Sequence, residues 1–201
     1  DKDIDYLVCN DKKTLIYMAN LGCIEFNPWL SRYPGIEKPD FLVLDLDPED
    51  IGFSSVIEVA LVIKELLDSL KITSYPKTSG STGIHIYMHT GAKYHYDSIK
   101  LFAEWLAGQA HEQIPAISSI ERSPQKRQKK VYIDFLQNRK GQTVAAPYSL
   151  RPKPGATVSW PLSWDEVNKD LKMEDYTIHN VPDLLAKGND PWADIYSSVV
   201  N

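Results

Sequence analysis

Residues 41–44 are all apolar, residues 44–47 then alternate between Leu and Asp, and Pro48 ends the run. This pattern predicts a β-strand that stops at the proline, because proline cannot donate to a sheet ladder. Leu42, Leu44 and Leu46 lie on one face of such a strand, and the residues between them lie on the other. We therefore expect the leucine face to pack into the core.

The remaining periodicity predicts a mixture of helices and strands. Helices are expected over residues 12–21, 54–70 and 96–109, and further strands over residues 72–78, 83–89 and 131–136. Ser54 or Ser55 can cap the second helix, and the run from Ser163 to Glu166 has the form of a capping box that opens a further helix. One hairpin is clear, and the elements do not alternate regularly, which favours an α+β fold over a doubly wound sheet.

Composition indicates a globular protein of one domain. The chain has 201 residues, of which 43% are hydrophobic and 24% are charged. No apolar run approaches the roughly 20 residues of a membrane helix, and the first residues lack the order of a secretory signal. We therefore expect a cytoplasmic location, with Cys9 and Cys23 as reduced thiols.

Charge is distributed unevenly along the chain. The net charge is −5, which argues mildly against a protein that coats DNA without specificity. Lys126, Arg127, Lys129 and Lys130 nevertheless lie within five positions, just before the strand expected over residues 131–136. Taken alone, such a cluster is more often a solvated face than a binding site.

Asp45 and Asp47 are the clearest candidates for a functional role, because they lie on the strand face opposite the leucines. Their Cα atoms would be roughly 7 Å apart, and two like charges so placed repel each other. A divalent cation bound between them removes that repulsion, and both Mg²⁺ and Mn²⁺ bind carboxylate oxygens. The alternative is a pair of solvated carboxylates at a strand end, beside the turn at Pro48.

Asp134 is a further acidic residue within an apolar strand. It alternates with Val131, Ile133 and Phe135, where a charge is costly unless it is paired or bound to metal. Three carboxylates that converge from separate strands can hold two metal ions, one activating a 3′ hydroxyl and the other holding a triphosphate. The alternative is an aspartate on the exposed face of an edge strand.

Small residues form a loop between the two strands of the expected hairpin. In the run from Lys77 to Gly83, small side chains let backbone N–H groups approach phosphate oxygens, with Ser79 as an additional donor. His85 follows on the strand. The loop is not a Walker A loop, because no Gly-Lys-Ser/Thr occurs at the right spacing and no helix follows. The alternative is an ordinary hairpin turn.

Together and in this order, these segments resemble the polymerase domain of bacterial multifunctional DNA ligase D, a member of the archaeo-eukaryotic primase superfamily. The similarity extends from about Asp5 to Trp192. The stretches that carry it include Asp45-Leu46-Asp47-Pro48, Lys77-Thr78-Ser79-Gly80, Gly83-Ile84-His85, Tyr132-Ile133-Asp134-Phe135 and Ala146-Pro147-Tyr148-Ser149-Leu150-Arg151. A series this long and ordered is more specific than any one of its members.

The resemblance implies a fold, an activity and a set of partners. The fold would be an RRM-like, mostly antiparallel sheet with flanking helices, of the primase-polymerase type. The activity would be template-directed nucleotidyl transfer at DNA ends in non-homologous end-joining repair, with a nucleoside triphosphate and Mn²⁺ or Mg²⁺. Ku and a ligase domain would be partners. Residues 1–201 would form a single catalytic domain without the small N-terminal subdomain that family members carry before the point matching Asp5.

The resemblance also implies roles for particular residues. The implied metal ligands and catalytic residues are Asp45, Asp47 and Asp134. The residues implied to bind the nucleotide are Asn27, Ser79, Gly80, His85 and Arg151. In this context the residues expected to bind DNA are Lys126, Arg127, Lys129 and Lys130, because a primer or template backbone would run beside the strand that carries Asp134.

Three positions depart from the family's usual pattern. Asn27 stands where His usually precedes Pro-Trp, Thr82 where Lys is usual, and Gln137 where many members have Arg. Each replacement weakens triphosphate binding and leaves the three aspartates unchanged. The alternative function is therefore a catalytically weakened module that binds nucleotide or DNA ends and associates with a ligase.

A third interpretation is a phosphatase of the haloacid dehalogenase type, suggested by two aspartates spaced by one residue after an apolar strand. That class needs a Thr close behind the second aspartate, whereas Pro48-Glu49-Asp50 follows here. This interpretation therefore ranks below the other two.

Overall fold

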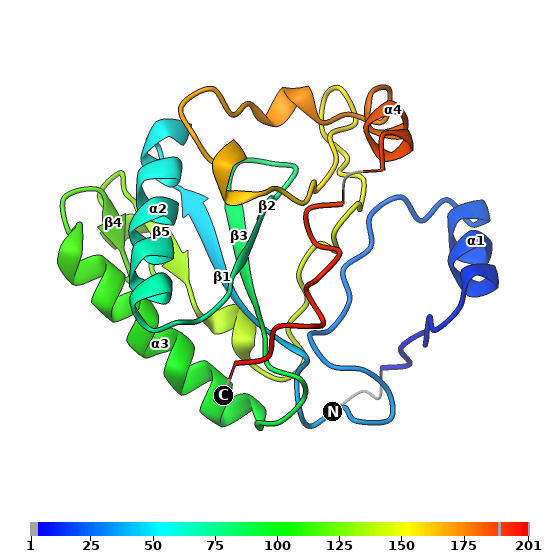
Figure 1. The fold of residues 1–201 in the computed structure, drawn as a ribbon, viewed down its shortest axis with the longest axis horizontal. Coiled ribbons are helices and arrows are strands. Elements are labelled where there is room, and N and C mark those ends of the chain that lie inside the picture. Colours follow the sequence, from blue (N-terminus) through cyan, green and yellow to red (C-terminus); the bar gives the residue numbers. More distant parts are fainter. Residues whose placement is uncertain (1–3, 189, 201) are drawn as a thin grey trace.

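The fold is that of a computed structural model, in which residues 4–188 and 190–200 are described. Its five strands form one sheet with the order β2-β3-β1-β5-β4 (Figure 1). The strands are β1 (Phe41–Pro48), β2 (Tyr75–Thr78), β3 (Ile84–His89), β4 (Ser118–Ser119) and β5 (Val131–Asp134). The short pair of β4 with β5 is parallel and the other pairs are antiparallel. This confirms the expected α+β fold with a mostly antiparallel sheet and flanking helices.

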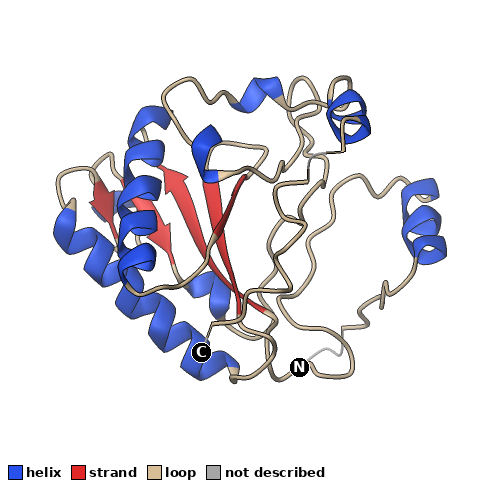
Figure 2. Ribbon diagram, viewed as in Figure 1, coloured by secondary structure: helices blue, strands red, loops and turns tan. Residues whose placement is uncertain are grey.

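Two long helices cover one face of the sheet, and α1 stands apart from it (Figures 1 and 2). The α-helices are α1 (Lys12–Asn20), α2 (Phe53–Ser69), α3 (Tyr96–Gln113) and α4 (Val181–Ala186). Short 3₁₀ helices occur at Pro124–Lys126, Leu136–Asn138, Trp164–Glu166 and Met173–Asp175. Within the described ranges, the helices are all too short or too polar to cross a membrane.

The leucine face of β1 packs against α2 and α3, as the alternation predicts. Leu42, Leu44 and Leu46 are fully buried in the main core, together with apolar residues of both helices and Ile84 and Ile86 of β3. Burial of each such side chain contributes on the order of 1.5–3 kcal/mol relative to exposure in water. The helices therefore fix this face of the sheet and leave the opposite face for the polar residues.

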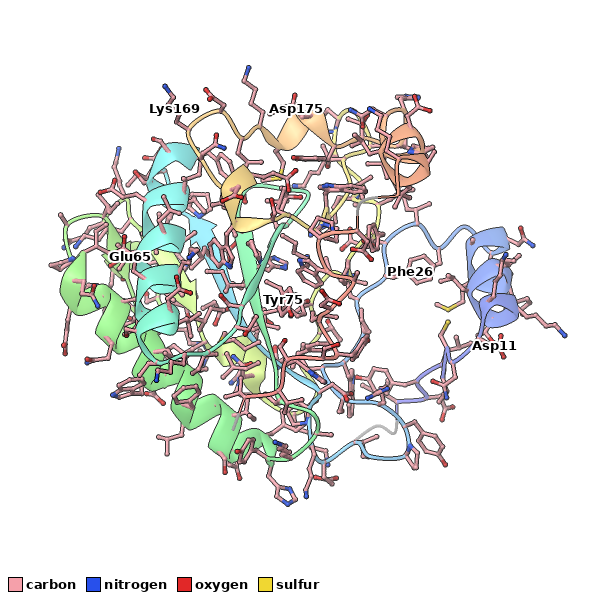
Figure 3. The ribbon with its side chains drawn as sticks, in the orientation of Figure 1. Asp11, Phe26, Glu65, Tyr75, Lys169 and Asp175 are labelled. Atoms are coloured by element: carbon pink, nitrogen blue, oxygen red, sulfur yellow. The ribbon has the colours of Figure 1, made fainter. Side chains whose placement is uncertain are left out.

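A second, smaller core covers the beginning of β1 on that opposite face. Val43 and Tyr87 pack there against Trp192 and Val144, which come from the later part of the chain. Tyr75, labelled in Figure 3, lies at the edge of this core, and its Oη donates to the Asp194 carbonyl at 3.2 Å. Because these residues lie over the start of β1, the acidic residues near its end border a separate cavity.

Asn138 fixes β5 beside β1 through its side-chain amide. β5 ends at Asp134, and the chain turns into the 3₁₀ helix Leu136–Asn138. Asn138 is fully buried; its Oδ1 accepts the Val43 N–H at 2.8 Å and its Nδ2 donates to the Val43 carbonyl at 2.6 Å. The side chain thus satisfies two backbone groups of β1 beyond the end of the ladder.

Two local predictions were wrong. Neither Ser54 nor Ser55 caps α2, which begins after Gly52 with no side-chain hydrogen bond at its N-cap. The capping box at Ser163 is present, but the helix that it opens is only the 3₁₀ turn Trp164–Glu166. The backbone leaves the helical conformation at Val167, which is buried in the main core. The other elements are present where expected, with ends that shift by one to four residues.

Candidate active site

Four ionisable residues form one row across the sheet. Lys77 of β2 is the cross-strand partner of His85, His85 of β3 is the partner of Asp45, and Asp45 of β1 is the partner of Asp134 on β5. Cross-strand partners project from the same face, so all four lie opposite the leucines. Asp47 lies two residues further along β1 and shares this face. The sheet thereby gathers the three aspartates that the sequence singled out.

Asp45 and His85 form a buried pair, with His85 Nε2 3.2 Å from Asp45 Oδ1. Among the described residues, neither Asp45 Oδ1 nor His85 Nδ1 has a hydrogen-bond partner. Burial lowers the pKa of His85, which keeps the imidazole neutral at neutral pH. Burial also opposes ionisation of Asp45, but the contact with His85 and the charges of Lys77 and Arg151 outweigh it and lower the pKa of Asp45. Asp45 is therefore a carboxylate.

The carboxyl groups of Asp47 and Asp134 on the same face hold their protons more strongly than an ordinary aspartate does. Burial, followed by the charges of Asp45 and Asp134, raises the pKa of Asp47 to about 7. Burial and the charge of Asp45 also raise the pKa of Asp134, against the hydrogen bond from the Leu136 N–H. Burial contributes most to both shifts, and mutual repulsion among the three acidic groups adds to it; a bound divalent cation would remove that repulsion.

The donor set suits a divalent cation, although the three side chains do not surround a common point. Asp45 and Asp47 line a cavity of about 200 Å³, and the buried Asp45 Oδ1 has no hydrogen-bond partner among the described residues. Asp134 does not line this cavity. In residues 4–188 and 190–200, no group of three or more His, Cys, Asp or Glu side chains is placed to hold a metal ion. The register therefore brings the three aspartates to one face of the sheet, whereas of the three only Asp45 and Asp47 line the cavity.

Ser79 organises the loop between β2 and β3. Its Oγ accepts the backbone N–H groups of Ser81, Thr82 and Gly83 at 3.0, 3.1 and 3.0 Å. The N–H groups that were expected to approach phosphate thus converge on the Ser79 hydroxyl. Its own O–H group can still donate to a ligand.

Gly80 allows Arg151 to pack onto this loop. It has a φ of +69°, and a Cβ there would lie 2.7 Å from Arg151 Cγ and 2.9 Å from the Ser159 nitrogen. Arg151 in turn donates from Nη1 to the Ser79 carbonyl at 2.7 Å. The loop and the arginine therefore form one packed unit, and Arg151 lines the same cavity as Asp45.

Glu25 is a residue of this site to which sequence reasoning gave no role. Its Oε2 lies 3.3 Å from Arg151 Nε, and its Oε1 accepts a hydrogen bond from Asn27 Nδ2 at 3.0 Å. Glu25 thus contacts the side chains of Asn27 and Arg151, which were both expected to bind the nucleotide. Glu25 lies within the part of the chain that resembles the family, but that resemblance indicated no contact between Glu25 and Arg151.

Lys77 is a second residue whose position the sequence did not reveal. Its side chain is fully buried, and Nζ donates to Ser159 Oγ and, at 3.4 Å, to the Thr78 carbonyl. Burial lowers the pKa of Lys77 to about 7. A lysine next to a glycine-rich loop suggests phosphate binding. The Lys77 ammonium is instead buried and donates hydrogen bonds within the protein.

The basic residues before β5 differ from one another in the structure. Lys126 is exposed, whereas the Arg127 guanidinium lies 3.8 Å from the centre of the Tyr132 ring. Lys129 Nζ lies 2.8 Å from a carboxylate oxygen of Asp50, and Lys130 Nζ donates to the Pro115 carbonyl at 2.7 Å. Their clustering in sequence therefore does not form one uniform basic surface.

The mostly antiparallel sheet, with acidic residues beside a glycine-rich loop, is the arrangement of a primase-polymerase domain, a class of nucleotidyltransferases. Residues 1–192 match the family described as LigD, primase-polymerase domain. The chain belongs to this family, and the resemblance inferred from its sequence is confirmed.

Individual relatives agree with this assignment. The chain is 34% identical over 198 residues to the bifunctional non-homologous end joining protein LigD of Bacillus subtilis (strain 168), covering 98% of this chain and 32% of that protein. It is 30% identical over 185 residues to the multifunctional non-homologous end joining protein LigD of Pseudomonas aeruginosa, covering 90% and 22%. The chain thus spans about a third or less of these relatives.

A solved structure is also similar. The polymerase domain from Mycobacterium tuberculosis ligase D, in complex with DNA, superposes with a TM-score of 0.83 at 26% sequence identity. The match covers 92% of this chain and 68% of that one. The fold is therefore that of a LigD polymerase domain over nearly the whole chain.

Proposed function

We propose that this chain catalyses template-directed nucleotidyl transfer at DNA ends in non-homologous end-joining repair, with Asp45, Asp47 and Asp134 as ligands of Mn²⁺ or Mg²⁺. The observation that carries the proposal is the register that makes Asp45 and Asp134 cross-strand partners. Membership of the LigD primase-polymerase family supports the reaction class. The names of the relatives support the repair context.

The three aspartates provide the oxygen ligands that these cations prefer. When bound, the cations would lower the pKa of the attacking 3′ hydroxyl and neutralise charge on the triphosphate and leaving group. His85, which is neutral, contacts Asp45 and restricts its orientation. Asp47 must lose its proton to bind a cation, because its pKa is about 7.

The nucleotide would bind in the cavity that Asp45 and Asp47 line. Arg151 supplies a positive charge there, and the Ser79 hydroxyl and the Asn27 amide supply hydrogen-bond donors. Gly80 contributes by its small size, since it lets Arg151 pack onto the loop. These residues hold and orient the triphosphate beside the carboxylates.

The proposed DNA partner is the end of a primer-template. Support comes from the similar polymerase domain that was solved in complex with DNA. Lys126 is exposed in the segment that precedes β5, where it can contact a phosphate of the DNA backbone. A ligase domain and Ku are further proposed partners, in keeping with relatives that are longer than this chain.

A second candidate is a module that binds nucleotide or DNA ends without catalysis. The contacts of Glu25 favour it, because they already engage Arg151 and Asn27. Thr82 also brings no counter-charge to the loop. The phosphatase interpretation has no such support, because the chain belongs to a different family.

Primer extension in the presence of Mn²⁺ separates these candidates. We expect the unmodified chain to extend a primer, and Asp45→Asn or Asp134→Asn to lower the rate below about one hundredth. Asp68→Asn is a matched control, because Asp68 is an exposed partner of Lys64 on α2. Stabilisation by nucleotide without extension would support the binding module. Undiminished extension by Asp45→Asn would refute the proposed reaction.

A further inference from the structure

We propose that Tyr132 and Arg127 are positioning residues for Asp134, forming a relay from the basic loop before β5 to the acidic face of the sheet. The inference rests on the proposed function, in which Asp134 is a metal ligand. It assigns Arg127 a role different from the DNA contact that its sequence neighbourhood suggests.

The first link of the relay is the hydrogen bond between Tyr132 and Asp134. Asp134 Oδ1 accepts from Tyr132 Oη at 3.3 Å and from the Leu136 N–H at 2.8 Å, while Oδ2 accepts from Gln137 Nε2 at 3.3 Å. Since a carboxylate oxygen has two lone pairs, Oδ1 is fully used and Oδ2 retains capacity for a cation.

The second link is the packing of Arg127 on Tyr132. The guanidinium carbon lies 3.8 Å from the ring centre, and Nε and Nη2 donate to the carbonyls of Glu121 and Arg122 at 3.0 and 2.9 Å. Its Nη1 lies 3.6 Å from Glu49 Oε2, and the side chain is only 14% exposed. A guanidinium engaged in this way has little capacity left for a DNA phosphate. It holds the tyrosine ring in place instead.

The relay matters because Asp134 is the cross-strand partner of Asp45, which lines the cavity together with Asp47. Without the Tyr132 hydroxyl, the carboxylate would rotate more freely, and ordering it around a cation would cost binding free energy. Loss of such an outer hydrogen-bond partner typically lowers metal affinity about 10–100-fold. The relay therefore restricts the orientations that the Asp134 carboxylate can adopt when an ion binds.

Two conservative variants test the links separately. Tyr132→Phe keeps the ring and its packing but removes the donor, and Arg127→Lys keeps the charge but loses the planar stack. Lys126→Ala is the matched control, because Lys126 is exposed in the same loop. Mn²⁺ affinity would be measured by calorimetry, with the electron paramagnetic resonance signal of bound Mn²⁺ as a second readout. The salt dependence of DNA binding would be measured in parallel.

We expect Tyr132→Phe and Arg127→Lys each to weaken Mn²⁺ binding about tenfold, with the KM for nucleotide at saturating Mn²⁺ and the salt slope of DNA binding unchanged. Lys126→Ala should lower that slope by about 1 and leave Mn²⁺ affinity unchanged. Wild-type or tighter Mn²⁺ affinity in Tyr132→Phe would overturn the relay while leaving the proposed function intact. Failure of the unmodified chain to bind Mn²⁺ would overturn both.

Discussion

Asp45 on β1 and Asp134 on β5 are direct cross-strand partners, and Asp47 follows on the same face of β1. Acidic side chains in this relation repel one another unless they are protonated or bound to a cation. The sheet nevertheless holds them together, because the leucine face of β1 is buried and Asn138 joins the strands from the other end. Repulsion among these side chains therefore lowers the stability of the folded chain.

The raised pKa of Asp47 predicts how this destabilisation depends on pH. Because the pKa is about 7 in the folded chain and near 4 when unfolded, the folded state binds this proton more strongly. The proton bound to Asp47 stabilises the folded state, and this stabilisation is fully present below about pH 4 and is lost as the pH rises through about 7. In chelator, the Tm of Asp47→Asn should therefore exceed that of the unmodified chain increasingly between about pH 5 and pH 8. Thermal unfolding measures this, and a constant difference in Tm would contradict it.

Gly80→Ala should damage both stability and nucleotide binding. Gly80 and Gly141 have similar positive φ values, +69° and +84°, so alanine is strained at either position. Only at Gly80 would the new Cβ meet Arg151 and backbone atoms below 3.0 Å; at Gly141, no described atom lies within 4 Å. We expect Gly80→Ala to lower the free energy of unfolding by about 1–3 kcal/mol more than Gly141→Ala. Equal effects in denaturant unfolding would show that the close packing of Arg151 is unimportant.

Glu25→Gln should strengthen nucleotide binding. Gln can still accept the hydrogen bond from Asn27, but it removes the negative charge beside Arg151. A bound triphosphate is then no longer repelled by the Glu25 carboxylate. The screened repulsion amounts to roughly 1 kcal/mol, so we expect its removal to tighten binding about three- to tenfold. Fluorescent-nucleotide titration measures the Kd. Weaker binding would mean instead that Glu25 serves chiefly to hold Arg151 in place.

Asn138→Ala should destabilise the sheet strongly. The substitution removes the side-chain partners of the Val43 N–H and carbonyl, which are buried within β1. Unsatisfied buried groups cost about 1–3 kcal/mol each, so the free energy of unfolding should fall by about 2–5 kcal/mol. Asn168→Ala is a matched control at an exposed asparagine, with an expected loss below about 1 kcal/mol. Similar losses in both variants would contradict the role of Asn138.

The sequence predicted the elements whose pattern is local. The leucines of β1 and the apolar period of α2 indicate a strand and a helix because each repeats along one segment. The capping box at Ser163 is equally local, yet it opened only one turn, because burial of Val167 in the core outweighs the helix signal. Tertiary packing determines the length of such a helix, and a short stretch of sequence carries no information about that packing.

The site was predictable as a set of residues and not as a geometry. Asp45, Asp47 and Asp134 stand out as charges in apolar strands, but their register depends on pairing between distant segments. The same holds for Glu25, which meets Arg151 across most of the chain. The metal-binding, catalytic, nucleotide-binding and DNA-binding roles of these residues all stay predictions, because contacts within the chain do not reveal ligands.

Mn²⁺ titration of the chain with a non-hydrolysable nucleoside triphosphate tests the shared carboxylate site most directly. The unmodified chain should bind Mn²⁺ at the aspartates, and Asp134→Asn should bind more than about tenfold more weakly even though Asp45 and Asp47 remain. Equal affinity and stoichiometry in the two proteins would show that Asp134 is not a ligand, and would contradict the proposed site.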